Sequence, residues 1–226
     1  MDWQRIEVLA GAVGPALFVA TFTIEGWLRP GYHPVGMFIS ELSLGPRGFI
    51  QILNFVVLGL LTFAFAGGVA AEFHEGRASR TGPILLAIIG ISFVASGVFV
   101  MDPILSAMRF VPVPEQISWH AQMHGFFGNL IFSLAPVSCF VFLRRFRVEP
   151  RWRWFQPWTL AAGIISAGAV ILMAVGPARP PARANIFNES IGLIQRTAIV
   201  PWLGWQLWFA SELQRSAWLK SSPQAK

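Results

Sequence analysis

The sequence contains little charge, a single cysteine and a single tyrosine. Only 12% of its 226 residues are charged, whereas a soluble globular domain carries about 25%. The one cysteine, Cys139, lies inside an apolar run, so an intrachain disulfide is excluded. Ten tryptophans accompany the lone tyrosine, and indole rings favour the interface between lipid and water. These features exclude an ordinary soluble domain and indicate a membrane protein.

Long apolar runs recur along the chain and predict its fold class. A membrane-spanning helix needs about 20 mostly apolar residues. The first run lacks the short apolar core and small-residue cleavage site of a removable signal peptide, so we expect it to be retained. The sequence predicts an all-α, polytopic membrane protein, with residues 1–226 forming a single domain of six transmembrane helices in one bundle. The predicted spans are 8–28, 50–73, 83–101, 119–143, 158–176 and 191–213.

The basic residues are distributed unevenly between the two sets of loops. Eleven lysines and arginines fall in the termini and in the second and fourth loops, against five in the other loops. The positive-inside rule therefore predicts that the N- and C-termini are both cytoplasmic. The formal charge of +6 comes mainly from these loops, where topology and anionic lipid account for it. We expect membrane lipid as a partner and no nucleic acid.

The polar residues near the predicted spans gather on the opposite, external side. Several are ionisable, and such groups at membrane depth usually pair inside the bundle or serve a function. The candidates are Glu25, His33, Ser40, Glu41, Asp102, His120, His124 and Arg196. This asymmetry predicts a polar pocket that faces outward and binds a lipid headgroup or another small amphiphile.

The spacing of two histidines suggests one form of chemistry for this pocket. His120 and His124 are four residues apart and would share a helix face, which suits two ligands of one zinc ion. A catalytic zinc usually has three protein ligands, and either His33 or Asp102 could be the third. The alternative is that both histidines cap or bridge helices through hydrogen bonds. Zinc is the cofactor that the sequence suggests; a bis-histidine haem is the less favoured alternative, because the candidate histidines lie near one surface.

The remaining candidates each have a functional and a structural interpretation. As catalytic residues, Ser40 would polarise the substrate and Glu41 would carry protons; as structural residues, they would cap a short helix. As a ligand-binding residue, Arg196 would hold a phosphate or carboxylate; as a structural residue, it would pair with Asp102. Glu25 is a second candidate for ligand binding, and its structural partner would be Arg29 or a protonated histidine.

Three short motifs resemble those of a known family. Ile39-Ser40-Glu41-Leu42 follows the first span, Asp102-Pro103 follows the third, and His120 and His124 open the fourth. In this layout the chain resembles the multi-pass bacterial membrane proteins grouped as domain of unknown function 998. The resemblance implies the helical membrane fold and a place in the bacterial inner membrane, and it implies no reaction.

A looser similarity connects the same residue types to membrane hydrolases of the alkaline ceramidase and progestin-receptor type. Those proteins combine a serine, an aspartate and three histidines around zinc. Ser40, Asp102, His33, His120 and His124 match that set, although their order and the predicted six spans depart from it. The similarity implies a metal-dependent hydrolase of lipid amides or esters.

Two other classes of function are open from the sequence. One is a non-enzymatic subunit or assembly factor of a larger membrane complex. Trp202, Trp205 and Trp208 share a face of the last span and would contact lipid or a partner there. The other is a small transporter, which is the weaker match because the ionisable residues line one leaflet rather than two.

Overall fold

The protein is an all-helical bundle in a computed structural model that describes residues 3–103, 114–175 and 186–221. No strand occurs in these residues. Six long helices are joined by two 3-10 turns and one short helix. They are α1 (Trp3–Leu28), η1 (Ile39–Ser43), α2 (Gly48–Glu72), α3 (Thr81–Val98), α4 (Trp119–Phe146), η2 (Pro150–Phe155), α5 (Gln156–Val175), α6 (Ile186–Glu189) and α7 (Ile191–Ser221).

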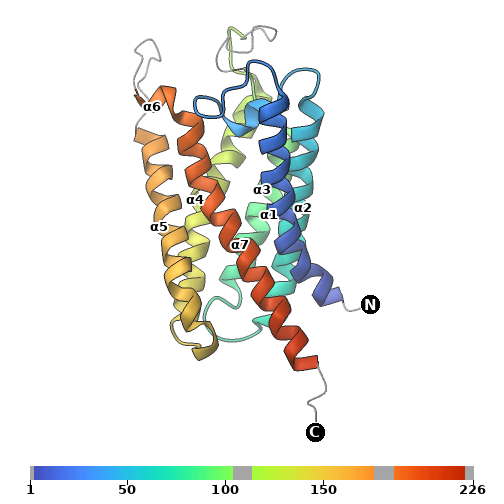
Figure 1. Ribbon diagram of the computed structural model, residues 1–226, viewed down its shortest axis with the longest axis vertical. Coiled ribbons are helices and arrows are strands. Elements are labelled where there is room, and N and C mark those ends of the chain that lie inside the picture. Colours follow the sequence, from blue (N-terminus) through green and yellow to red (C-terminus); the bar gives the residue numbers. More distant parts are fainter. Residues whose placement is uncertain (1–2, 104–113, 176–185, 222–226) are drawn as a thin grey trace.

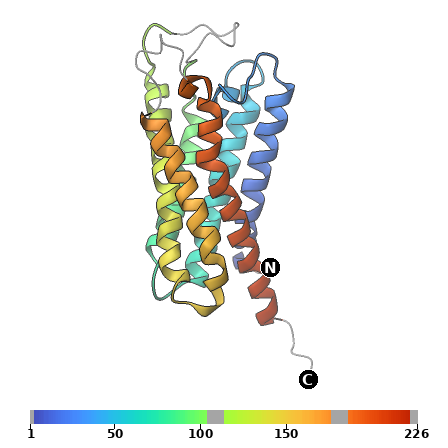
Figure 2. The ribbon, with the colours of Figure 1, turned by 60° about the vertical axis from the view of Figure 1, so that its left-hand side comes forward.

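The long helices alternate in direction and form a ring (Figures 1 and 2). Each packs against the helix before and after it in sequence, and α7 closes the ring by packing against both α1 and α5. Small residues allow the closest approaches, as packing rather than hydrophobicity drives helix association in lipid. A Cβ on Gly59 of α2 would lie only 2.5 Å from the carbonyl oxygen of Gly90 of α3.

The two ends of the bundle differ in the elements that close them. At the end that we name the terminal end, α1 begins and α7 ends, beside the α2–α3 loop and η2 (Figure 1). At the other, the η1 end, the segment between α1 and α2 lies across the ring beside α6 and the start of α4 (Figure 1). Both chain ends therefore emerge at one end of the bundle, as the six-span prediction requires.

Five of the six predicted spans are confirmed as helices long and apolar enough to cross a membrane. They correspond to α1, α2, α3, α4 and the unit of η2 with α5. Their outer surfaces carry many exposed aliphatic side chains, such as Leu17, Leu60 and Ile164. The sixth predicted span is α7, which extends eight residues beyond the predicted end to Ser221. Its polar residues, among them Gln195, Arg196 and Gln206, make it less apolar than the other five.

The prediction that three tryptophans of α7 form an outward face is wrong. Trp202 is fully buried and Trp205 is 3% exposed. Their indole N–H groups donate to Ser138 Oγ on α4 at 2.9 Å and to Thr159 Oγ1 on α5 at 3.0 Å. Because α7 closes the ring, this face meets other helices of the same chain. Only Trp208 is half-buried, where it packs against rings near the start of α5.

Candidate functional site

An open cavity of about 450 Å³ lies at the η1 end of the bundle. Its polar lining comes from η1, the residues after α3, α4 and α7, namely Ser40, Asp102, His124, Asn129 and Gln195. The rest of the wall is apolar and includes Phe38, Met101, Ile117, Phe132 and Met173. We name this space the wide cavity. It combines a few polar groups with a larger apolar surface, as is typical of sites for small ligands.

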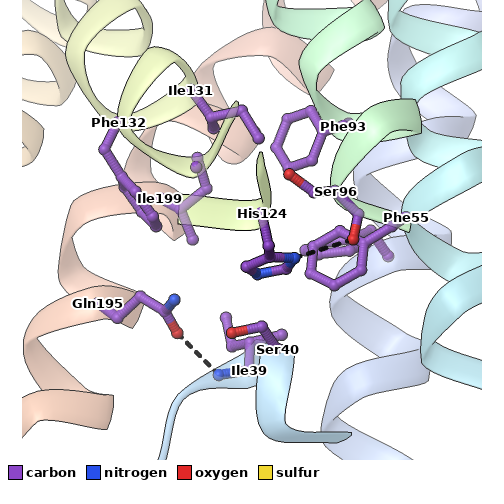
Figure 3. Close-up of a pocket in the computed structure, with 12 residues that line it drawn as sticks. Ile39, Ser40, Phe55, Phe93, Ser96, His124, Ile131, Phe132, Gln195 and Ile199 are labelled. Carbon is purple, nitrogen blue, oxygen red and sulfur yellow. Dashed lines mark hydrogen bonds between the residues drawn. The ribbon is translucent and has the colours of Figure 1, made fainter. Parts of the chain in front are cut away.

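A smaller chamber between the helices adjoins the wide cavity. This inner chamber has a volume of about 40 Å³ and shares Ser40, His124 and Gln195 with the wide cavity. Its deeper walls are apolar and belong to α1, α2, α3, α4 and α7; they include Phe18, Phe55, Phe93, Ile131 and Ile199. Figure 3 shows the polar side chains gathered around the His124 ring, with η1 below them. Residues far apart in sequence thus meet at one place.

His124 is held by backbone carbonyl groups at the end of α3. Its Nδ1 lies 3.0 Å from the oxygen of Ser96 and 2.8 Å from that of Phe99. Carbonyl oxygens only accept hydrogen bonds, so Nδ1 carries the proton and donates. In the neutral ring the lone pair is then on Nε2, which is a base and a potential metal ligand. The predicted alternative, in which a histidine bridges helices, is confirmed for His124.

Asp102 fixes the start of α4. Its two carboxylate oxygens accept from the backbone N–H of Ser118 at 2.6 Å and from Ser118 Oγ at 2.8 Å. Ser118 Oγ in turn accepts from the N–H of Ala121, which caps the helix. The predicted pair between Asp102 and Arg196 is wrong, because these two side chains bond to other groups. Asp102 nevertheless lines the wide cavity, where a carboxylate has capacity for further donors.

Ser40 and Glu41 are adjacent but face different surroundings. Ser40 lines both the wide cavity and the inner chamber. Glu41 is 5% exposed, and its Oε1 accepts from the N–H of Phe38 at 2.8 Å, which confirms the capping interpretation for this residue. Burial raises the pKa of Glu41, while the bond from Phe38 and the charge of Arg196 partly offset the rise.

Arg196 joins the start of α7 to the segment before η1. Its Nη1 donates to the carbonyl oxygens of Pro34 at 2.6 Å, Met37 at 3.0 Å and Gly192 at 2.9 Å. Its Nη2 donates to the hydroxyl of Tyr32, which itself donates to the oxygen of Phe38 at 3.1 Å. Burial raises the pKa of Tyr32, and the nearby Arg196 charge lowers it in part. The sequence suggested Arg196 as an anion anchor, but these contacts show that its guanidinium group is bonded to groups of the protein itself.

Glu25 belongs to a second set of contacts that holds the same segment. It is 4% exposed and pairs with Arg29 at 3.1 Å, one of the predicted partners, and also with Arg47. Arg29 Nη1 also donates to the oxygen of Leu44 at 2.6 Å. The pairings therefore tie the end of α1 to the start of α2. Glu25 does not line the wide cavity, so it does not enter the proposed site.

The predicted zinc ligands do not converge. His33 is exposed, and His120 is exposed and packs against the rings of Phe99 and Trp119. Of the four, only Asp102 and His124 line the wide cavity. Within residues 3–103, 114–175 and 186–221, no group of three His, Cys, Asp or Glu side chains could hold a metal ion. The zinc site stays a prediction.

Three polar residues that line the two spaces were not among the predicted site residues, namely Ser96, Asn129 and Gln195. Asn129 lies in a predicted apolar run, and Gln195 lies near the start of another. A polar residue at membrane depth is itself a sign of function, and that signal could have identified both. Tyr32 lines neither space but contacts Arg196, and it carried only the signal of being the sole tyrosine.

Comparisons with known proteins give a family and no activity. No curated protein and no solved structure matches the chain. The family model described as a protein of unknown function, DUF998, matches residues 12–212. That match covers all six long helices in whole or in large part. The chain therefore belongs to the DUF998 family.

Proposed function

We propose that this protein binds a small amphiphile, such as the headgroup region of a lipid, in the wide cavity. The main support for this proposal is the composition of the cavity lining, which combines five polar side chains with a larger apolar surface. Cavities of roughly 300–1,000 Å³ hold drug-sized ligands. The observed volume of about 450 Å³ suits a headgroup with part of one chain rather than a whole two-chain lipid.

The proposal includes six spans in the bacterial cytoplasmic membrane, with α7 as the sixth and both termini in the cytoplasm. Support comes from the position of α7, which runs along the bundle beside α1 and α5 (Figures 1 and 2). The loops with most arginines lie at the terminal end, together with both chain ends, and the positive-inside rule assigns that end to the cytoplasm. The wide cavity would then open toward the external leaflet.

Gly128 is a position from which an added side chain can enter the cavity, and Gly168 supplies a matched control. A Cβ added at Gly128, which lines both spaces, would meet no atom within 4 Å. The same holds at Gly168 of α5, which lines neither space. Gly128→Leu and Gly168→Leu are therefore a matched pair. Both remove a helical glycine, which by itself stabilises a helix by about 1 kcal/mol.

The experiment measures binding of a single-chain lysophospholipid with a fluorescent label to purified protein in detergent. Gly128→Leu should weaken binding by about tenfold or more, since its side chain occupies space that the ligand needs. Gly168→Leu should bind as the parent does. Equal binding by all three proteins, each with an unchanged unfolding temperature, would overturn the proposal. Mass spectrometry of lipids that co-purify with the parent and are lost from Gly128→Leu would identify the natural ligand class.

The orientation of His124 favours an enzymatic form of the same proposal. With Nδ1 bonded to carbonyl oxygens, Nε2 can act as a general base toward Ser40 or a water molecule in the shared space. The reaction would be hydrolysis of a lipid amide or ester. His124→Gln keeps a polar side chain but removes the base, so hydrolysis of a fluorogenic lipid ester should fall by about 100-fold or more while lipid binding persists. Unchanged hydrolysis would leave binding as the function.

The metal-dependent version is a narrower proposal. It requires His124 and Asp102 as two zinc ligands and at least one further ligand. Glu41 would have to leave its bond to Phe38 to carry a proton. The proposed role in a larger complex loses the tryptophan face on which it rested, because Trp202 and Trp205 are buried.

A further inference from the structure

A second cavity, of about 300 Å³, lies at the terminal end of the bundle, opposite the wide cavity. It is formed by the loop 76–81 between α2 and α3 together with the last turns of α4. Its lining includes the side chains of Arg77, Arg80, Arg144 and Val141. We name it the arginine cavity. It shares no residue with the wide cavity and plays no part in the proposed function above.

The positive charge of this cavity is not balanced by its lining. No aspartate or glutamate lines it among the residues that the structure describes. Nearby, Glu72 pairs with Arg151 at 3.5 Å and Glu149 pairs with Arg145 at 2.6 Å, while Glu75, just before the loop, is exposed and does not line the cavity. The N-terminus of α3, which follows the loop, adds the positive end of a helix dipole.

The side chain of Arg145 fixes the conformation of the loop that forms the cavity. Arg145 is 8% exposed and donates through Nη1 to the carbonyl oxygens of Glu75 at 2.7 Å and Arg77 at 3.0 Å. Its guanidinium lies 3.8 Å from the centre of the Phe73 ring. Gly76 and Ala78 both have positive φ, at 83° and 60°, which produce the tight turn. A cavity with fixed walls loses little conformational entropy when a ligand binds.

We propose that the arginine cavity binds the phosphate group of an anionic ligand, as a phosphate monoester or diester. Arginine guanidinium groups match phosphate oxygens in charge and geometry. Ser79 and Thr81 line the same cavity and can add hydroxyl donors. The side chains of Arg80 and Arg144 form no hydrogen bond or ion pair with any described residue, so both are available for a ligand.

The location favours an anionic phospholipid over a soluble phosphate. Val141 lies one turn below Arg144 on α4 and extends the cavity toward the apolar body of the bundle. Phospholipid phosphates lie at the depth where apolar spans end, and each arginine near an anionic surface adds about fivefold in affinity. The lipid chains would then lie along the outer surface of α3 and α4.

The test compares two double variants of equal charge. Arg80→Gln/Arg144→Gln removes two cavity arginines, and Arg147→Gln/Arg153→Gln removes two exposed arginines at the same end that do not line the cavity. Each protein is reconstituted in nanodiscs of equal parts phosphatidylglycerol and phosphatidylcholine. Native mass spectrometry then measures which lipid remains bound after the protein has been released from the nanodisc. The measurement is made with and without excess inorganic phosphate.

The parent and the control variant should retain phosphatidylglycerol in preference to phosphatidylcholine. The cavity variant should retain about tenfold less phosphatidylglycerol, with its unfolding temperature unchanged. Displacement of the lipid by inorganic phosphate would also support the phosphate site and would identify a soluble phosphate as its ligand. Equal loss in both double variants would show general surface attraction and overturn the proposal, as would equal retention in all three proteins.

Discussion

Gln195 on α7 accepts a hydrogen bond from the backbone N–H of Ile39 on η1, at 2.7 Å from Oε1. These residues are 156 positions apart, and both are buried at the inner chamber. The bond is visible in Figure 3, beside Ser40. It places the last helix and the segment after the first helix in one wall, so the shape of the site depends on both.

The first prediction concerns this bond. Gln195→Ala leaves the buried N–H of Ile39 without its acceptor, which should lower the free energy of unfolding by about 1–3 kcal/mol. Amide hydrogen exchange over residues 39–43 should become faster, because η1 loses its attachment to α7. Gln122→Ala, at an exposed position of α4, is the control and should behave as the parent. Unchanged exchange in Gln195→Ala would contradict this role.

The second prediction concerns the guanidinium of Arg196, which serves four acceptors. Arg196→Lys keeps the charge but cannot reach all four, so thermal unfolding should show a loss of about 2 kcal/mol. Tyr32→Phe removes one of the four contacts together with the bond from Tyr32 to the oxygen of Phe38, and should cost about 1–2 kcal/mol. If Arg196 instead held an external anion, the lysine variant would keep its stability and respond to added phosphate.

The third prediction follows from the raised pKa of Glu41. The folded protein favours the protonated form of Glu41. Its contribution to the free energy of unfolding is therefore complete below the pKa of the unfolded chain, and it is lost as the pH rises through the raised pKa of the folded protein. Glu41→Gln keeps an acceptor for the N–H of Phe38 and cannot ionise. We expect it to be at least as stable as the parent at neutral pH, with a flatter pH profile in thermal unfolding.

Glu41→Ala is the companion to that variant. It removes the acceptor altogether and should be about 1 kcal/mol less stable than Glu41→Gln at every pH, because neither variant can ionise at this position. A glutamine variant as unstable as the alanine variant at neutral pH would mean that the carboxylate charge itself stabilises η1.

The fourth prediction separates the two histidines in a metal assay. His124 lines the wide cavity, whereas His120 is exposed against Phe99 and Trp119. Any zinc found by elemental mass spectrometry should therefore be lost in His124→Ala and retained in His120→Ala. Loss of zinc in both single variants would instead support His120 and His124 as two ligands of one zinc ion, as the sequence suggested.

The fifth prediction concerns Trp202. Trp202→Phe removes its bond to the buried Ser138 Oγ and leaves a space, which should lower the free energy of unfolding by about 1–3 kcal/mol. The oligomeric mass in detergent should not change, because this face is internal. A changed oligomeric mass with an unaltered free energy of unfolding would instead indicate that these tryptophans contact a partner protein.

The sequence predicted the helices closely because their signal is local. Each long helix includes most of a predicted apolar run, and every predicted boundary of the first five spans lies within five residues of the corresponding end of α1, α2, α3, α4 or α5. The environment of α7 could not be predicted in this way. The tryptophans of a lipid-facing helix and those of a helix that closes a ring have the same spacing, and only the neighbours of Trp202 and Trp205 distinguish them.

The candidate site was predicted in part. Ser40, Asp102 and His124 were selected from their residue types, and the structure brings all three to the wide cavity. Glu25, Glu41 and Arg196 were selected by the same reasoning, yet their charges bond to protein groups that hold the segment from residue 29 to residue 47. Charge at membrane depth indicates that a partner is needed, but the identity of the partner depends on the folded chain.

The closure of the ring by α7 has a consequence for how the protein is made. The first five long helices can pair with their sequence neighbours as each leaves the ribosome, since they form successive antiparallel hairpins. Gln195 and Ile199 reach the inner chamber only when the last helix has packed against the others. A chain interrupted before residue 191 would therefore hold most of the helices and lack a finished site, so the proposed ligand binding would report that the last helix has been made and packed.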